Sequence, residues 1–139
     1  MGIDISGWVE VFDPYTGEWD GVIRINYLVG RTPKMFALLF GVGNQWNYAA
    51  VVANRGFPMD SSSEVVLERR AIKDKRTGEI SPSWIAWSEI EQLPFEGVAK
   101  EALVPSWEAL FDLMRPLANR YTSRGVRLVV WFRDDGSPS

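Results

Sequence analysis

The most regular hydrophobic pattern lies in the last third of the chain, between Ser106 and Arg124. Apolar residues recur there at intervals of three and four, which places them along one face of an α-helix. Gly125 follows directly and is typical of a helix end, whereas Pro116 predicts a kink because its ring displaces a backbone carbonyl. The predicted core-facing residues of this long helix are Trp107, Leu110, Phe111, Met114, Leu117 and Tyr121.

Alternating or densely apolar stretches predict strands at both ends of the chain. Gly7–Phe12 is rich in β-forming residues, and a turn sequence that begins at Asp13 separates it from the alternating stretch Glu18–Val29. This arrangement is typical of a β-hairpin. We expect Ile23, Ile25 and Tyr27 on its buried face. The stretch Val126–Arg133 is apolar almost throughout, which favours an interior strand.

The middle of the chain carries shorter signals. Thr32 and Pro33 predict the N-cap and first residue of a helix that runs to Phe40 and ends at Gly41. From Gly41 to Ser63 the pattern is irregular, and a short strand at Ala49–Val52 is its only expected regular element. Irregular segments of this length tend to be functional or mobile.

Three further signals follow this irregular segment. Ser63–Arg69 has the pattern of a short helix, and Lys73–Gly78 has the charged composition of an exposed turn. Ser88 is a predicted helix N-cap, with Glu89 and Glu91 in the first turn, where the helix dipole favours negative charge.

Together these elements predict an α+β fold. We expect an antiparallel sheet of three to four strands, a long C-terminal helix packed on one face and a long irregular middle segment. At 139 residues the chain is expected to form a single domain over residues 1–133, followed by a disordered tail at 134–139. Val126–Arg133 could also lie at a sheet edge and pair across a two-fold axis, so a homodimer is one expectation.

Charge and residue types exclude several functions. The net charge is −3 and no basic run exceeds two residues, so nucleic acid is not the expected partner. No apolar run approaches the roughly 20 residues of a membrane span, which favours a cytoplasmic protein that does not bind membranes. Histidine and cysteine are absent, which removes the commonest general base, most zinc ligands and thiolate chemistry. We therefore expect no metal or cofactor. What remains is chemistry by carboxylate, Lys, Tyr, Ser or Arg side chains, or binding without chemistry, and the absence of His and Cys favours binding.

Two glycines and a group of acidic residues suggest functional sites, and the acidic residues are the stronger candidates. Gly41 and Gly43 do not form a phosphate loop, because a third glycine and a following Lys-Ser or Lys-Thr are missing. The acidic residues near the N-terminus include Asp4 and Glu10, and paired carboxylates can act as acid and base or hold a hard cation. Asp4, which precedes the first strand, is the stronger candidate.

Cationic and aromatic side chains also mark a candidate binding region. Arg31, Lys34 and Arg55 lie near the starts of loops or helices and are suited to an anion such as phosphate. Trp46 and Tyr48 lie two residues apart in the irregular segment. Their rings could face a flat heterocycle or cover the core.

Several motifs resemble a family of small phage and prophage proteins. The stretches are "MGIDISGWVEV", "LVGR" followed by "FALLFGV" and Asn44, "ANRGFPMDSSSEV" and "SPSWIAWSEI". The family pattern has M-G-x-D-I-H-x-x-x-E, then R-N-Y-D-x-F, G-V-R-N, R-G-L-P-x-D-x-S-x-E and H-S-x-S-W. The resemblance spans Met1 to about Ile90. The matching residues are Asp4, Glu10, Arg31, Asn44, Arg55, Gly56, Pro58, Asp60, Ser81, Ser83 and Trp84.

The chain departs from this pattern at both histidines. Ser6 and Ile80 stand where the family has His, and Gly43 stands where it has Arg. The resemblance implies a polar pocket that keeps its arginines but has lost metal affinity or proton transfer. The expected ligand-binding residues are Asp4, Ser6, Arg31, Asn44, Trp46, Tyr48, Arg55, Asp60, Ser81, Ser83 and Trp84.

Three functions remain open. The first is a phage-encoded protein that binds a small ligand in the host cytoplasm without turnover. The ligand could be a nucleotide immune signal of the host, such as a cyclic nucleotide or an ADP-ribose derivative, or another small molecule. The second is a phage accessory or host-takeover factor that binds a protein. The third is a nucleotide hydrolase that uses Asp4, Glu10 and Asp60. The first is preferred, because a pocket without its histidines is suited to binding.

Overall fold

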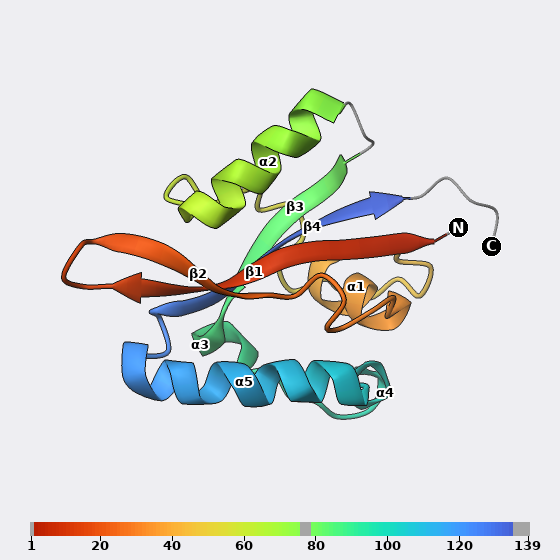
Figure 1. The fold of residues 1–139 in the computed structure, drawn as a ribbon. Helices are drawn as coiled ribbons and strands as arrows, with labels where there is room; N and C mark the ends of the chain where they lie inside the picture. Colours follow the sequence, from red (N-terminus) through yellow and green to blue (C-terminus); the bar gives the residue numbers. More distant parts are fainter. Residues whose placement is uncertain (1, 76–78, 135–139) are drawn as a thin grey trace.

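The protein folds around one antiparallel sheet (Figure 1). The computed structural model describes residues 2–75 and 79–134. The sheet has four strands in the order β2-β1-β4-β3. They are β1 (Ile3–Asp13), β2 (Glu18–Arg24), β3 (Glu79–Ala86) and β4 (Val126–Asp134).

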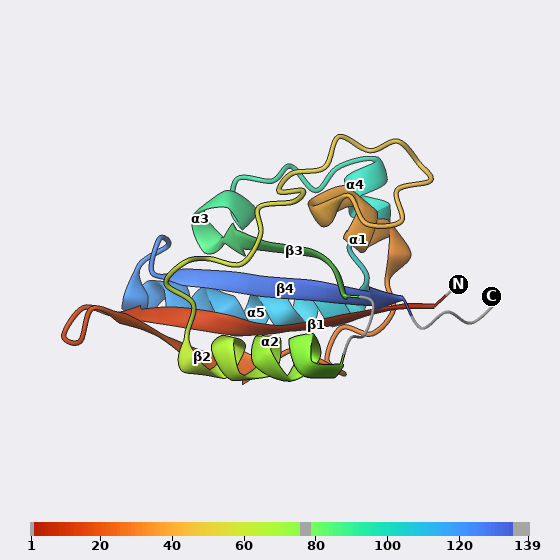
Figure 2. The same cartoon turned by 90° about the horizontal axis from the view of Figure 1, so that it is seen from above.

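Helices cover both faces of this sheet. The helices are α1 (Pro33–Phe40), α2 (Ser63–Lys75), α3 (Trp87–Ile90), α4 (Val98–Ala102) and α5 (Pro105–Tyr121). Figures 1 and 2 show α5 on one face, along β1 and β4, and α2 on the opposite face. The predicted α+β fold, with a long helix on an antiparallel sheet, is therefore confirmed. No helix in the described ranges is both long and apolar enough to cross a membrane.

The alternation of side chains along β4 divides the apolar residues into two clusters. Leu128 and Val130 belong to the larger cluster, which includes the buried face of α5. Val129 and Trp131 point the other way and pack with Val65 of α2. Because successive side chains of a strand face opposite sides, a strand buried on both faces is apolar at nearly every position.

The central place of β4 corrects one expectation. The strand Val126–Asp134 lies between β1 and β3, so it cannot form an edge that pairs with a second copy. The edges are β2 and β3. At the β2 edge the backbone N–H of Gly21 donates to Glu64 Oε1 of α2, at 3.0 Å. Beside β3, the N–H of Gly56 donates to the carbonyl of Pro82, at 2.8 Å.

Two predicted strand features are wrong. The strand β2 ends at Arg24, so the predicted alternation does not reach Tyr27, which is fully exposed, while Ile25 is buried as expected. Ala49–Val52 forms no strand in the described chain. The N–H of Val52 instead donates to the carbonyl of Leu39, at 2.8 Å, and so satisfies a carbonyl at the end of α1.

The predicted helix α1 is confirmed at both ends. Gly41 adopts a left-handed conformation with φ of 70° and its N–H donates to a carbonyl one turn earlier. Thr32 lies at the N-cap as expected, but its hydroxyl makes no capping bond. It accepts instead from Nε1 of the fully buried Trp107, at 2.7 Å, and so joins α1 to α5.

The remaining helix boundaries differ from the predicted ones. The helix α2 begins at Ser63 as expected but runs to Lys75, so the predicted turn at 73–78 is partly helical, and 76–78 lie outside the described residues. The N-cap of α3 is Ala86 rather than Ser88. The long helix ends at Tyr121 rather than Arg124, and it continues through Pro116. Of the expected tail, 134 belongs to β4 and 135–139 lie outside the described residues.

Candidate ligand-binding site

A cleft of about 560 Å³ opens beside the face of the sheet that carries α2. Each strand or loop around it contributes a large side chain. Trp19 comes from β2, Trp84 from β3, Arg127 from β4 and Arg55 from the irregular segment. The remaining lining residues are Ala86, Ser88, Glu89 and Arg124.

The first part of the cleft is built on a buried ion pair. Glu10 of β1 lies directly opposite Arg127 of β4 in the sheet, so both side chains leave the same face. Arg127 Nε donates to Glu10 Oε1 at 2.6 Å, and the other carboxylate oxygen of Glu10 accepts from the N–H of Ser62 at 2.7 Å. With both oxygens of Glu10 occupied, this fully buried carboxylate is satisfied.

Arg127 also contacts Trp19, which lines the cleft, and Asp60. Its guanidinium lies 3.8 Å from the centroid of the Trp19 ring. Nη1 of Arg127 and Nε1 of Trp19 donate to the two carboxylate oxygens of Asp60, at 3.1 and 3.0 Å. Burial raises the pKa of Asp60, but the charge of Arg127 and the hydrogen bonds from Arg127 and Trp19 outweigh it and lower the pKa. Asp60 is therefore ionised at neutral pH.

The opposite wall repeats the same combination of arginine, tryptophan and carboxylate. The Arg55 guanidinium lies 4.5 Å from the centroid of the Trp84 ring. It donates to both oxygens of Glu89, at 2.7 and 2.6 Å. The hydrogen bond from Arg55 is the main reason why the pKa of Glu89 is lowered. Glu89 Oε1 also accepts from the N–H of Ala86, which fixes the carboxylate at the start of α3.

Arg124 differs from the other two arginines of the cleft. Its side chain is exposed, and it makes no ion pair or hydrogen bond with the part of the chain that the structure describes. Arg55 and Arg127 already have carboxylate partners. Arg124 is therefore the cation at this cleft that remains available to an anionic ligand.

The structure brings four of the expected site residues to this region. Arg55 and Trp84 line the cleft, and Asp60 bonds to two lining residues. Ser83 is buried behind it, where its hydroxyl donates to the carbonyl of Val52 and accepts from the N–H of Arg55 at 3.4 Å.

The other expected residues lie elsewhere and mainly support loops. Asp4 and Arg31 form an exposed ion pair at 2.8 Å, and the Ser6 hydroxyl accepts from Asn26 at 3.2 Å. Ser81 has a left-handed backbone with φ of 53°. It falls within the register irregularity between Ile80 and Ser83.

Asn44 has a structural role in the irregular segment. Its side chain donates to the carbonyl of Tyr48 at 2.7 Å and accepts from the N–H of the same residue at 2.9 Å. The turn closed in this way stacks the rings of Trp46 and Tyr48, with centroids 5.7 Å apart. These rings pack on each other and do not line the cleft.

Sequence reasoning missed Trp19, Glu89, Arg124 and Arg127 as site residues. Arg127 and Glu10 gave a usable signal, since each is a charge within a strand that is otherwise rich in apolar residues. Charged residues at inward-facing strand positions are expected to pair. No local pattern marks Trp19 or Arg124.

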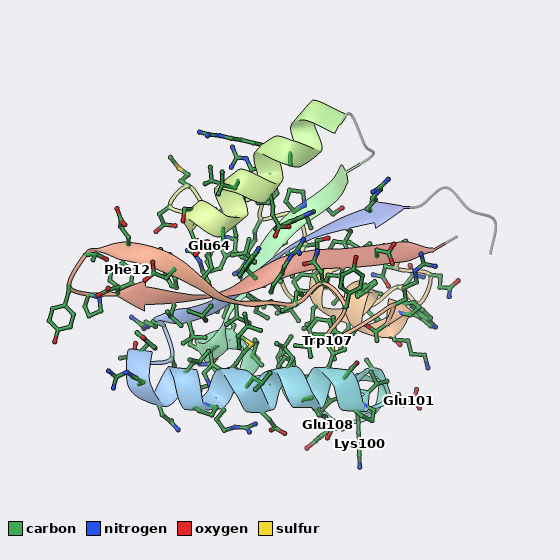
Figure 3. The ribbon with its side chains drawn as sticks, viewed as in Figure 1. Phe12, Glu64, Lys100, Glu101, Trp107 and Glu108 are labelled. Atoms are coloured by element: carbon green, nitrogen blue, oxygen red, sulfur yellow. The ribbon has the colours of Figure 1, made fainter. Side chains whose placement is uncertain are left out.

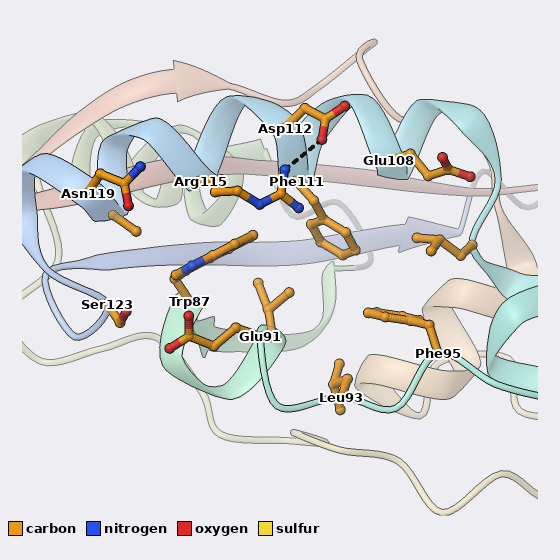
Figure 4. Close-up of a pocket in the computed structure, with 13 residues that line it drawn as sticks. Trp87, Glu91, Leu93, Phe95, Glu108, Phe111, Asp112, Arg115, Asn119 and Ser123 are labelled. Atoms are coloured by element: carbon orange, nitrogen blue, oxygen red, sulfur yellow. Dashed lines mark hydrogen bonds and ion pairs between the residues drawn. The ribbon is translucent and has the colours of Figure 1, made fainter.

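A second cleft, of about 600 Å³, lies between α5 and α3 (Figure 4). Its floor includes Trp87 and Phe111, which are each 5% exposed and belong to the larger apolar cluster. Its rim includes Glu91 and the exposed ion pair between Arg115 and Asp112 at 2.8 Å. Because the rings are packed into the core, this cleft offers little aromatic surface to a ligand. No group of three His, Cys, Asp or Glu suited to a metal ion occurs among the described residues.

Comparison with known proteins gives no relative for this chain. No protein-family model matches it, and no curated protein or solved structure matches it either. The likeness to phage proteins therefore remains a resemblance of motifs, and the function has to be argued from the geometry of the cleft.

Proposed function

We propose that the protein binds a small anionic ligand with a planar ring, such as a nucleotide, in the cleft between Trp19 and Trp84. The observation that carries this proposal is the meeting in one cleft of two tryptophan rings with Arg124, a cation that has no ion pair among the described residues. Aromatic faces accept nucleobases by stacking, and a guanidinium binds phosphate through parallel hydrogen bonds. Each ring is also held in place by an arginine, so the cleft is formed before a ligand arrives.

The state of the nearby carboxylates favours binding over turnover. Asp60 and Glu89 have lowered pKa values and are engaged by arginine, so neither holds a proton to donate near neutral pH. The hydrolase alternative joins Asp4 to Glu10 and Asp60. Asp4 lies six residues from Glu10 along β1, which is about 20 Å in an extended strand. This distance is too long for one reacting group to contact both.

The motif resemblance supplies the ligands to test first. If the chain is a phage protein, a nucleotide immune signal of the host would be a natural ligand, and its capture without turnover would silence the defence that it activates. A cyclic nucleotide or an ADP-ribose derivative has the planar base and the phosphates that the cleft suits.

A thermal-shift panel followed by calorimetry tests this function. AMP, ADP-ribose and cyclic di-AMP are added to the full chain, and at least one should raise the Tm, since a ligand at about one hundred times its Kd adds about 2.7 kcal/mol of stability. Ligand recovered after heat release should be chemically intact. Recovery of a cleaved product would support the hydrolase, and silence across the panel would reject the nucleotide proposal and favour the protein-binding factor.

A pair of arginine variants locates the site. Arg124→Gln should weaken binding at least about tenfold, as expected for a lost charge-assisted contact. Arg70→Gln is the control, because Arg70 is also exposed but lies on α2, outside the cleft lining. Equal affinities for the two variants would place the ligand elsewhere.

A further inference from the structure

A third cleft adjoins the proposed ligand site. It has a volume of about 610 Å³ and lies between the β1–β2 hairpin and the C-terminal end of α5. Figures 1 and 2 show these elements together at one end of the molecule, and Figure 3 marks Phe12 on the hairpin. The lining residues are Phe12, Asp13, Pro14, Tyr15, Arg120, Tyr121, Thr122, Arg124 and Gly125.

The two clefts share a residue and a dividing wall. Arg124 lines both of them. Phe12 of the third cleft contacts Trp19 of the proposed site edge to face, with ring centroids 5.4 Å apart. The N–H of Phe12 donates to the carbonyl of Gly125 at 2.9 Å, which ties the hairpin to the turn that carries Arg124. The clefts therefore keep a fixed position relative to each other.

The third cleft carries the same types of group as the proposed site. Its aromatic residues are Phe12, the half-buried Tyr121 and Tyr15, and Tyr15 is 98% exposed. Tyr15 is nevertheless on an ordered turn, because its N–H donates to Asp13 Oδ1 at 2.8 Å. The Arg120 side chain, like that of Arg124, has no ion pair within the described residues.

The turn between the clefts has an unusual backbone. Thr122 ends α5 with φ of 70° and ψ of 161°, a region that β-branched residues rarely adopt. Arg124, which lines both clefts, follows two residues later, before β4 begins at Val126. Strained residues of this kind occur preferentially at functional sites.

We propose that the two clefts together bind one ligand with two planar rings joined by phosphate, which is the chemistry of a dinucleotide. This inference rests on the proposed function and specifies its ligand. One ring stacks beside Trp19 and Trp84, the other stacks on Tyr15, and the bridging phosphate binds Arg124, with Arg120 beside it. Joining the two rings makes the second contact intramolecular, which raises the affinity without a new surface.

The test compares ligands that have one ring or two. Calorimetry on the full chain uses AMP, the linear dinucleotide pApA, cyclic di-AMP and a ten-residue oligoadenylate. At least one of the two-ring ligands should bind at least about tenfold tighter than AMP, as expected from effective concentration. An oligoadenylate that binds tighter still would overturn the dinucleotide as ligand and indicate a single strand.

Tyrosine variants test whether the higher affinity for two-ring ligands depends on the third cleft. Tyr15→Ala should reduce the affinity for the two-ring ligand to the affinity of the unmodified chain for AMP. Tyr27→Ala is the matched control, because Tyr27 is equally exposed and lies outside both clefts. Equal affinities of the unmodified chain for AMP and both two-ring ligands would overturn this inference and leave the proposed function intact, whereas no binding of any nucleotide would reject both.

Discussion

Arg127 and Glu10 form an ion pair at 2.6 Å with side chains only 7% and 0% exposed, and the pair crosses the centre of the sheet between β4 and β1. It anchors the α2 side of the sheet, because Arg127 also reaches Asp60 and Trp19 and Glu10 holds the N–H of Ser62. The stability of the fold and the shape of the cleft therefore depend on the same two residues.

Removal of one partner of this ion pair should lower the free energy of unfolding considerably. Glu10→Ala leaves a buried guanidinium without its main partner, and we expect a loss of about 3–5 kcal/mol in the free energy of unfolding, measured by urea denaturation. Asp112→Ala is the control, because its ion pair with Arg115 has side chains 70% and 58% exposed. That variant should change stability by less than about 1 kcal/mol. Similar losses in both variants would contradict the structural role of the pair.

Stability should fall in acid because of Asp60 and Glu89. Both pKa values are lowered in the folded protein, so both carboxylates stabilise the fold above their unfolded pKa and lose this effect as the pH falls through the folded value. We expect the urea midpoint to decrease as the pH falls below about 4. Glu89→Gln should be less stable than the unmodified chain at pH 7 and should show a weaker pH dependence.

The bond between Trp107 and Thr32 should contribute measurably to stability. Thr32→Val removes the acceptor and leaves the indole N–H of the buried Trp107 unpaired, at a cost of about 1–3 kcal/mol. Trp107→Phe removes the donor. The double variant should be more stable than the sum of the single losses predicts, since no unpaired group remains. Strict additivity in a thermal or urea denaturation series would show that the bond is not formed.

Close packing of β1 against β4 should make Gly7 irreplaceable. A Cβ added at Gly7 would overlap the carbonyl oxygen of Val129, so the backbones of two central strands would have to move apart. We expect Gly7→Ala to lose about 3 kcal/mol or more, or to fail to accumulate in soluble form. Ser6→Ala, one position earlier on β1, should cost only about 1 kcal/mol through its bond with Asn26. A Gly7→Ala chain as stable as Ser6→Ala would contradict the strand register.

The sequence predicted an element correctly where a periodic pattern of apolar residues was bounded by residues that begin or end a helix. The helix Pro33–Phe40 was predicted to the residue because proline begins it and glycine ends it. The strand β3 was not predicted, since Pro82 and two serines interrupt its pattern and its register is irregular between Ile80 and Ser83. For Tyr27 the error had the opposite cause, because the alternation in the sequence continues beyond the end of the strand.

Less of the candidate site than of the fold could be predicted from the sequence. Arg55, Asp60 and Trp84 were expected from motifs, but the residues that hold them in place come from distant parts of the chain. The ion pair of Arg127 with Glu10 joins positions 117 residues apart, and Trp19 meets Asp60 across 41 residues. No local periodicity encodes such contacts, so the cleft becomes visible only when the strand order β2-β1-β4-β3 is known.

This strand order also governs how the chain can fold. Ile3 pairs with Asp134 at the far end of the described chain, so the first strand finds its main neighbour only in the last strand. Contacts that close such long loops form late and slow the search for the native state. During synthesis β1 and β2 can form a hairpin early. The position between β1 and β3 in the sheet cannot be filled until β4 has left the ribosome. Of the four strands of this sheet, the one that is made last therefore completes it.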